Sequence, residues 1–313
     1  MPELVEGFAV GHWTDLRACT GCTVILPPDG AVAAAEVRGG GPGTRESELL
    51  EPAASVDGVD AVLLTGGSAY GLAAADGVAS WLGDQGRGYV TAAGRVPLVS
   101  AAVVFDLALG DSAARPGPAE GHKACVASAR EIERGSLGVG TGCTVGKLLG
   151  PEGWCRGGLG FASRSLVDGT TVQAIAAVNA FGDVLGEEGS IIAGARRKDT
   201  FPGTVELLRE GVSHRRALRE ATTLVCVLTD ATLDKRQAWL VARSASAGTA
   251  RAVSPVATAL DGDMTFCLAS GERVADTLAV AAVAAETVAE AVRDGVRTAT
   301  ALPGCPAPAA GAS

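Results

Sequence analysis

The sequence predicts a layered α+β fold. Short apolar segments alternate with amphipathic helical segments along its 313 residues, without the strict strand–helix–strand rhythm of a doubly wound parallel sheet. Hydrophobic residues make up 47% of the chain and aromatic residues only 4%. Side chains as small as these favour closely packed sheets and helices. The 313 residues are enough for one large domain or two small ones, and we expect a single domain over residues 1–301.

Nine segments are predicted to be strands, because each is short, apolar or β-branched, and bounded by Gly, Pro or Asp. In chain order they are Cys22–Leu26, Val32–Val37, Ala61–Leu64, Gly88–Thr91, Ala101–Asp106, Gly157–Ser163, Thr170–Asn179, Thr222–Leu228 and Met264–Ala269. The polar, aperiodic region 186–202 is expected to be a surface loop.

Five segments are predicted to be helices from their three- and four-residue apolar spacing. They are Tyr70–Leu82, Pro118–Ile132, Thr204–Leu208, Asp234–Ala252 and Glu272–Val296. The last has an apolar stripe that begins at Val274 and Leu278. Residues 302–313, LPGCPAPAAGAS, are expected to be a disordered tail.

Composition argues against several classes of partner. The net charge is −9 and no basic stripe is visible, which is unfavourable for nucleic-acid binding. No apolar run reaches the roughly 18 residues that span a bilayer, and the acidic N-terminus lacks the features of a signal peptide. We therefore expect a cytoplasmic protein without a membrane partner.

The eight cysteines are interpreted as small buried residues or free thiols, since disulfides are rare in the cytoplasm. Cys19 and Cys22 have a CxxC spacing, but there is no second pair and the three histidines lie far apart in sequence. No metal and no cofactor are expected.

The glycine-rich stretch GSLGVGTGCTVGKLLG fits neither common phosphate-binding motif. A P-loop requires Gly at the position of Thr141 and Ser or Thr at the position of Leu148. The dinucleotide fingerprint requires Gly at the position of Cys143. Lys147 is the one cation in the stretch. It is either a solvated surface residue or a charge at the floor of a glycine-lined site, where it would keep a nearby amine neutral.

The pair Ala221–Thr222 marks the change from the polar segment HRRALRE to an apolar strand. A hydroxyl residue at the first position of a buried strand is what an N-terminal nucleophile hydrolase requires. Such an enzyme cuts its own backbone before that residue, and the new α-amine then serves as the base. Thr is also common at strand heads because β-branched residues suit strands, so the local pattern leaves both interpretations open.

Two polar motifs likewise have a structural and a functional interpretation. Asp261-Gly262-Asp263 is a strong turn signal, or a carboxylate pair in which one pKa is raised. Asn179 ends an apolar strand before Gly182, which is typical of turns, but an Asn amide can also donate to a developing oxyanion.

Taken together, these segments resemble the self-cleaving family of L-aminopeptidases, D-amino-acid esterases and amidases, with the β-peptidyl aminopeptidases and nylon oligomer hydrolases. The similarity covers about residues 10–299. It depends on VGHWTD, RGGGPGTRESELLEP, AVLLTGGSAYGLAAADGV, VPLVSAAVVFDLALGD, GVGTGCTVGKLLGPEG, RGGLGFAS, VQAIAAVNAFGDV, TTLVCVLTDATL and VSPVATALDGD. The resemblance implies a four-layer αββα sandwich of the N-terminal-nucleophile type.

Carried over residue by residue, the resemblance makes Thr222 the nucleophile and Lys147 the active-site lysine of the nylon-hydrolase branch. Asn179 resembles the Asn beside the oxyanion. Asp261 and Asp263 resemble the acidic pair that orients the nucleophile and its amine. The β-peptidyl branch has Ser and Glu at these two places, so this chain is nearer the aminopeptidase and nylon-hydrolase side.

The resemblance also implies cleavage after Ala221, into a large chain 1–221 and a small chain 222–313. Members are typically homo-oligomers, so we expect a tetramer of processed heterodimers. The implied function is hydrolysis of small amides, esters or short peptides with a free amino end, through an acyl-enzyme on Thr222.

Two departures from the family pattern keep alternatives open. Many relatives have Asn before the nucleophile, whereas Ala221 stands here; Ala–Thr is the cleavage pair of ornithine acetyltransferases, which share the fold. Phe105 stands where several relatives place a Tyr, so one oxyanion or substrate contact is either missing or supplied by a substrate-site neighbour such as Tyr70. An acyltransferase, or an unprocessed member that only binds a ligand, therefore remains an alternative.

Overall fold

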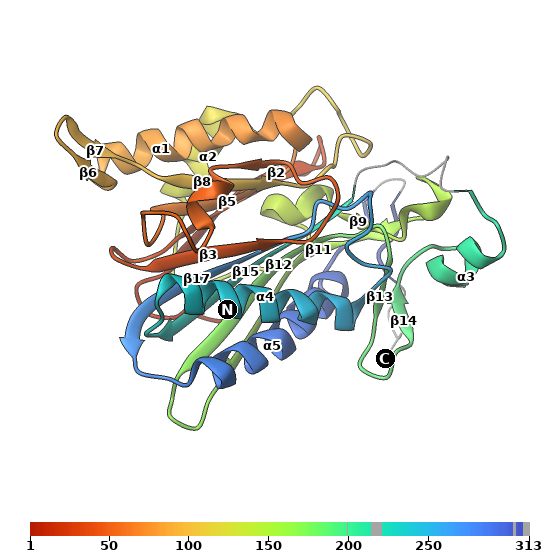
Figure 1. Ribbon diagram of the computed structural model, residues 1–313. Helices are drawn as coiled ribbons and strands as arrows, with labels where there is room; N and C mark the ends of the chain where they lie inside the picture. Colours follow the sequence, from red (N-terminus) through yellow and green to blue (C-terminus); the bar gives the residue numbers. More distant parts are fainter. Residues whose placement is uncertain (199, 214–220, 303–304, 309–313) are drawn as a thin grey trace.

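The structure, a computed structural model, describes residues 1–198, 200–213, 221–302 and 305–308. Two five-stranded sheets lie face to face, and helices cover the outer face of each (Figure 1). The result is the four-layer αββα arrangement that the family resemblance implies.

Both sheets are mixed. The first has the order β1 (Ala9–Asp15), β2 (Thr20–Leu26), β5 (Ala61–Thr65), β8 (Val99–Val103), β4 (Thr44–Arg45). The second has the order β11 (Gly158–Ser165), β12 (Thr171–Asn179), β15 (Thr222–Ala231), β17 (Met264–Arg273), β3 (Val32–Val37). Only the pairs β5–β8 and β15–β17 are parallel among these neighbours.

The helices pack in two pairs. Helices α1 (Ala74–Asp84) and α2 (Pro118–Val126) cover the first sheet, and α4 (Lys235–Ala252) and α5 (Thr277–Arg297) cover the second. Helix α4 begins with a capping box, in which Gln237 N donates to Asp234 Oδ1 at 2.7 Å and Asp234 N donates to Gln237 Oε1 at 2.8 Å. Asp276 caps α5 by accepting a bond from Leu278 N.

Smaller elements surround the two sheets. They are the strands β6 (Tyr89–Thr91), β7 (Gly94–Val96), β9 (Thr144–Val145), β10 (Cys155–Arg156), β13 (Asp183–Leu185), β14 (Ile191–Ala193) and β16 (Val253–Ser254), the helix α3 (Thr204–Arg209), and the 3-10 helices η1 (Ser47–Leu50), η2 (Ser68–Ala73), η3 (Gly138–Gly142) and η4 (Lys147–Leu149).

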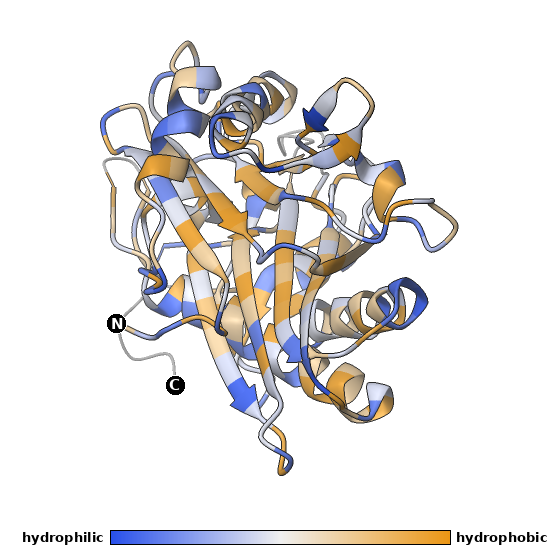
Figure 2. Ribbon diagram, turned by 90° about the vertical axis from the view of Figure 1, so that its left-hand side faces the viewer, coloured by the Kyte–Doolittle hydropathy of each residue, from blue (hydrophilic) through white to orange (hydrophobic). Residues whose placement is uncertain are grey.

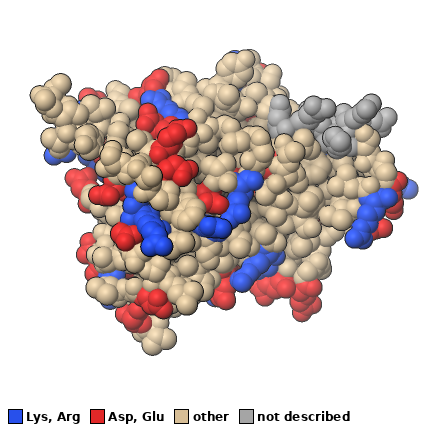
Figure 3. Space-filling view, viewed as in Figure 1, with Lys and Arg blue, Asp and Glu red and all other residues tan. Residues whose placement is uncertain are grey.

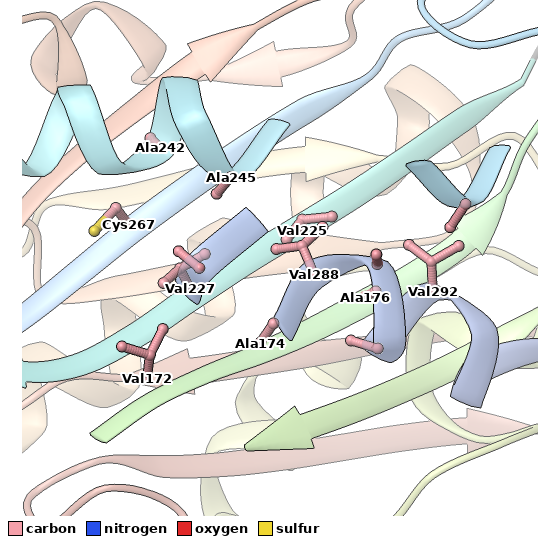
Figure 4. Packing of buried hydrophobic residues seen from close by; sticks show 14 of the residues in the cluster. Val172, Ala174, Ala176, Val225, Val227, Ala242, Ala245, Cys267, Val288 and Val292 are labelled. Carbon is pink, nitrogen blue, oxygen red and sulfur yellow. The ribbon is translucent and has the colours of Figure 1, made fainter. Parts of the chain in front are cut away.

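Three apolar cores separate the four layers, and Figure 2 shows the apolar residues along the strands. Strand β15 contributes to two of them because successive side chains on a strand point to opposite faces. Leu224 and Cys226 face the first sheet, whereas Val225 and Val227 face the helices. Small residues such as Ala242 of α4 let the helices lie close to the strands (Figure 4).

The predicted strands are confirmed as elements, with shifted ends; the strand predicted at 101–106 is β8, which ends at Val103. Strand β1 was not predicted. The helix predicted over 118–132 ends at Val126, because Ala129 exchanges backbone hydrogen bonds with Val10. The last helix begins at Thr277 instead of 272, since β17 continues through Arg273.

Part of the segment expected to be a disordered tail packs against the domain. Cys305 is buried, and it exchanges backbone hydrogen bonds with Leu302. Arg156 N donates to Pro306 O at 2.9 Å. These contacts tie residues 302 and 305–306 to the edge of β10.

All eight cysteines are buried and unpaired, as the sequence predicts. Within the described ranges, no three His, Cys, Asp or Glu residues gather into a group that could hold a metal ion. No helix there has both the length and the hydropathy needed to cross a bilayer. On the face shown in Figure 3, basic and acidic side chains are intermingled.

Candidate active site

Thr222 is the first residue of β15, in the centre of the second sheet. Its Cα partner on the antiparallel strand β12 is Asn179, and the parallel strand β17 begins on its other side at Met264. The side chain is buried and lies on the face of β15 that is turned toward the first sheet. The sheet register therefore brings together two of the predicted site residues.

The carbonyl oxygen of Ala221 accepts two hydrogen bonds. Thr222 Oγ1 donates to it at 2.6 Å, and the backbone N–H of Gly262 donates at 2.8 Å. Ala221 N in turn donates to Leu260 O at 3.1 Å, so both peptide groups of Ala221 are held by the segment before β17. Any Cβ at position 262 would lie 3.0 Å from Thr222 Oγ1, which explains why this position suits Gly.

Lys147 contacts Asn179, the strand partner of Thr222. Lys147 Nζ donates to Asn179 Oδ1 at 2.7 Å, and Thr144 N donates to the same oxygen at 3.0 Å. Lys147 is 2% exposed, so the interpretation as a solvated surface residue is wrong. Gly146, with φ of 71°, makes the turn that directs Lys147 inward, where a side chain at 146 would meet Ala195 N.

The amide group of Asn179 is already engaged. Its Nδ2 donates to Phe105 O at 3.1 Å, across the interface between the two sheets. Asn179 therefore links β12 to the segment after β8, in addition to facing Thr222 across the sheet.

Asp261 and Asp263 brace the backbone around Thr222. Asp263 Oδ1 accepts a bond from Thr223 N at 2.6 Å, and its Oδ2 accepts one from Ala257 N at 3.0 Å. Asp261 accepts bonds from Phe181 N and from both the N–H and the hydroxyl of Thr258. The turn interpretation thus holds for the contacts between Asp261 and Thr258. The bond from Phe181 N ties Asp261 to the end of β12, and the bond from Thr223 N ties Asp263 to β15.

Burial raises the pKa of Asp263 to about 7, and the neighbouring carboxylate of Asp261 adds to the shift. Two backbone N–H donors act in the opposite direction. Asp263 therefore changes its charge near neutral pH. It is bonded to the N–H of Thr223, the residue next to the proposed α-amine of Thr222.

A cavity of about 240 Å³ lies beside Thr222 and is termed here the Thr222 cavity. Phe105 and Val103 line it from the first sheet, and Leu260 lines it from the segment before β17. No charged side chain is among the described residues that line it. Tyr70 is absent from this lining: its ring is exposed and stacks under Arg115 at 4.1 Å, so it does not replace a hydroxyl at Phe105.

Two groups at the site escaped the sequence-based prediction. The Gly262 amide has no side-chain signature, although a Gly between two acidic residues before a strand was a usable signal. Asp106 lines a small cavity with Lys147 and accepts bonds from Thr20 Oγ1 and Gly67 N, both at 2.7 Å. Burial raises its pKa. The polar segment HRRALRE before Ala221 lies outside the described residues.

The fold defines the class of protein. The structure matches that of the L-aminopeptidase D-Ala-esterase/amidase from Ochrobactrum anthropi, described as a variant of the Ntn hydrolase fold, with a TM-score of 0.72. The match covers 94% of this chain and 85% of the other at 21% identity. The chain therefore has an N-terminal-nucleophile hydrolase fold.

The chain belongs to peptidase family S58, whose sequence profile matches residues 4–307. An uncharacterized aminopeptidase of Mycobacterium leprae, ML1167, is 42% identical over 288 residues, covering 85% of this chain and 77% of the relative. A 6-aminohexanoate-oligomer endohydrolase of Agromyces sp. (strain KY5R) is 29% identical over 279 residues, covering 85% and 74%. The family and fold expected from the sequence motifs are confirmed, and the chain is a hydrolase of the aminopeptidase and amidase type.

Proposed function

We propose that this peptidase activates itself by cleaving the bond between Ala221 and Thr222, and then hydrolyses small amides with Thr222 as the nucleophile. The observation that carries the proposal is the contact geometry of the Ala221 carbonyl. A hydroxyl and a backbone N–H both point at this oxygen before any cleavage. An oxygen held in this way is stabilised when negative charge develops on it.

In the self-cleavage step, Thr222 Oγ1 bonds to the carbonyl carbon of Ala221 and the peptide C–N bond breaks. The hydroxyl proton passes to the released nitrogen, which becomes the α-amine of Thr222. Water then hydrolyses the ester, leaving a carboxylate on Ala221 and a free hydroxyl on Thr222. The Gly262 N–H would stabilise the oxyanion in both additions.

In turnover, the free amine of Thr222 would take the hydroxyl proton as Oγ1 attacks the substrate carbonyl. The reference pKa of an α-amine is about 7.7–8.0, so a modest decrease makes it a base at neutral pH. Lys147 donates a hydrogen bond to Asn179, the strand partner of Thr222. Its positive charge would lower the pKa of the Thr222 amine. The acyl-enzyme on Thr222 is then hydrolysed by water.

The Thr222 cavity supports a substrate whose acyl part has a small, uncharged side chain. Its volume of about 240 Å³ and its lining of Pro42, Val103, Phe105 and Leu260 suit an apolar side chain or a short methylene chain. Amino-acid amides, esters and short peptides with a small apolar residue at the acyl position have side chains of this kind. We further propose, from the family resemblance, that the processed chains form a cytoplasmic homo-oligomer.

Intact-mass spectrometry and N-terminal sequencing of the purified protein test this proposal. We expect two chains whose masses sum to the precursor plus one water, with the smaller chain beginning at Thr222. Thr222→Ala should remain one chain, whereas Thr223→Ala, the matched control one residue away, should be cleaved. An uncleaved wild-type protein, or a different new N-terminus, contradicts the proposal.

A parallel assay separates the proposed hydrolase from an acyltransferase. Processed protein is incubated with an amino-acid anilide, and separately with N-acetylornithine and glutamate as acyl donor and acceptor. Release of the aniline without acetyl transfer supports the hydrolase. The reverse result supports the acyltransferase.

A further inference from the structure

A second cavity lies on the opposite face of β15 from the Thr222 cavity. It has a volume of about 260 Å³ and is termed here the α4 cavity, because Ala247 and Ala250 of α4 form one wall. The alternation of side chains along a strand explains the two positions: Thr222 points into one cavity and Thr223 lines the other.

The floor of the α4 cavity is polar and buried. Thr223, Asp263 and Thr265 line it and are 1%, 6% and 3% exposed. The hydroxyl of Thr223 has no hydrogen-bond partner among the described residues. Unpartnered buried hydroxyls are uncommon because desolvation of a polar group is costly, so this one offers a hydrogen bond to a ligand group in the cavity.

The rim carries the opposite charge. Arg38 lines the cavity with a side chain that is 44% exposed, and its Nε pairs with Glu36 at 2.9 Å. The remaining guanidinium N–H groups are suited to a carboxylate, which Arg binds through two parallel hydrogen bonds. Between this rim and the floor, the walls are apolar, formed by Ala247, Ala250 and Val256.

We propose that the α4 cavity binds a free amino acid, with its ammonium group at Asp263, its carboxylate at Arg38 and its apolar side chain against α4. A simple amine would leave the remaining guanidinium N–H groups of Arg38 without a carboxylate from the ligand, and a simple carboxylate would bring a negative charge toward Asp263. Only a ligand with both charges complements both ends of the cavity.

Asp263 connects this cavity to the strand that carries Thr222. Its Oδ1 accepts the N–H of Thr223, the residue that directly follows Thr222. An ammonium group at Asp263 would therefore contact the carboxylate that holds the start of β15. The inference concerns binding alone and goes beyond the proposed function, since it requires neither cleavage nor turnover.

Isothermal titration of Thr222→Ala protein tests the proposal, because this variant has no hydroxyl nucleophile to consume the probe. The probes are L-alanine, L-leucine and 6-aminohexanoate, with isopentylamine and 4-methylpentanoate as controls that each carry a single charge. We expect at least one of the three amino acids to bind and both single-charge controls to bind about tenfold more weakly, as loss of one charged hydrogen bond predicts.

Three further substitutions in the same background locate the binding site. Arg38→Met removes the rim charge, and Ala250→Leu fills the α4 cavity; each should weaken binding by about tenfold. Ala69→Leu is the matched control, since it adds the same volume at an exposed Ala that lines the Thr222 cavity, and it should leave binding unchanged. Arg38 and Ala250 are both solvent-exposed, so we expect these variants to fold.

Three outcomes overturn the proposal. The first is that none of the three amino acids binds. The second is that a single-charge control binds as tightly as the amino acids. The third is that Ala69→Leu abolishes binding while Ala250→Leu retains it, which would assign the ligand to the Thr222 cavity.

Discussion

The backbone amide of Gly262 donates a hydrogen bond of 2.8 Å to the carbonyl oxygen of Ala221, 41 positions earlier in the chain. A parallel bridge between Ala221 and Asp261 continues the register of the β15–β17 pairing three residues before its first pair, and it aligns the two groups. The bond proposed to be cut thus has an oxyanion donor already in place in the uncut chain. Gly262 lies between this bridge and the start of β17, which holds its amide at the Ala221 carbonyl.

Gly262→Ala should slow self-cleavage by about tenfold or more. This is less than the effect of removing an oxyanion donor completely, because the backbone N–H is displaced but still present. The new Cβ would lie 3.0 Å from Thr222 Oγ1 and 2.8 Å from Gly41 O, so the amide or the hydroxyl has to move. The fraction of precursor is followed by mass spectrometry after synthesis. Gly83→Ala, where a Cβ meets nothing closer than 4.0 Å, is the control and should be processed normally.

Asp261→Asn and Asp263→Asn should each lower the turnover of processed protein by about tenfold or more. Both oxygens of each carboxylate accept hydrogen bonds, whereas Asn has one acceptor and would turn an NH₂ group toward a backbone N–H. Asp276→Asn is the control, because Asn caps a helix as well as Asp does. Near-normal turnover in both site variants would return the pair to a purely structural role.

Lys147→Met should move the acidic limb of the pH–rate profile to higher pH. A nearby ammonium disfavours a second positive charge, so it lowers the pKa of the Thr222 amine, and its removal raises that pKa again. The amine must be neutral to act as the base, which gives the direction of the shift. Hydrolysis of an amino-acid anilide across pH is measured on fully cleaved protein, and an unmoved acidic limb would mean that Lys147 does not tune the base.

Asp263 should make the uncleaved fold less stable as pH rises toward neutrality. Its pKa is about 7 in the folded chain and 3.8 as the reference value, so over this interval the unfolded chain releases a proton that the folded chain retains. The stabilising contribution is complete below pH 3.8 and declines until about pH 7. Urea unfolding of Thr222→Ala, with and without Asp263→Asn, measures it as a difference between the two proteins at each pH.

That difference isolates Asp263 because all other carboxylates are common to both proteins. Between pH 5 and 7, the free energy of unfolding should decrease less in the neutral Asn variant than in its parent. The difference between the two slopes is at most about 1.4 kcal/mol per pH unit. Parallel curves for the two proteins would show that Asp263 is ionised throughout this range.

The sequence by itself determined the layered class, the strand that begins at Thr222 and the family. Strand β15 was predictable because it is buried on both faces, and such a strand is visible in the sequence as a continuous apolar run. The motifs around Lys147, Asn179 and the Asp261–Asp263 pair were sufficient to propose candidate site residues. Local pattern left each of them with a second, structural interpretation.

Tertiary structure rules out the solvated-surface interpretation of Lys147 and sets the contacts of the other candidate residues. Asn179 is the strand partner of Thr222, and Gly262 donates a hydrogen bond to Ala221. Both contacts join segments that are distant in sequence, and their register is set by the assembled sheets. Burial of Lys147, exposure of Tyr70 and the two cavities on opposite faces of β15 depend on the same packing. A sequence specifies which side chains are available, but only the folded chain determines which of them lose water and meet.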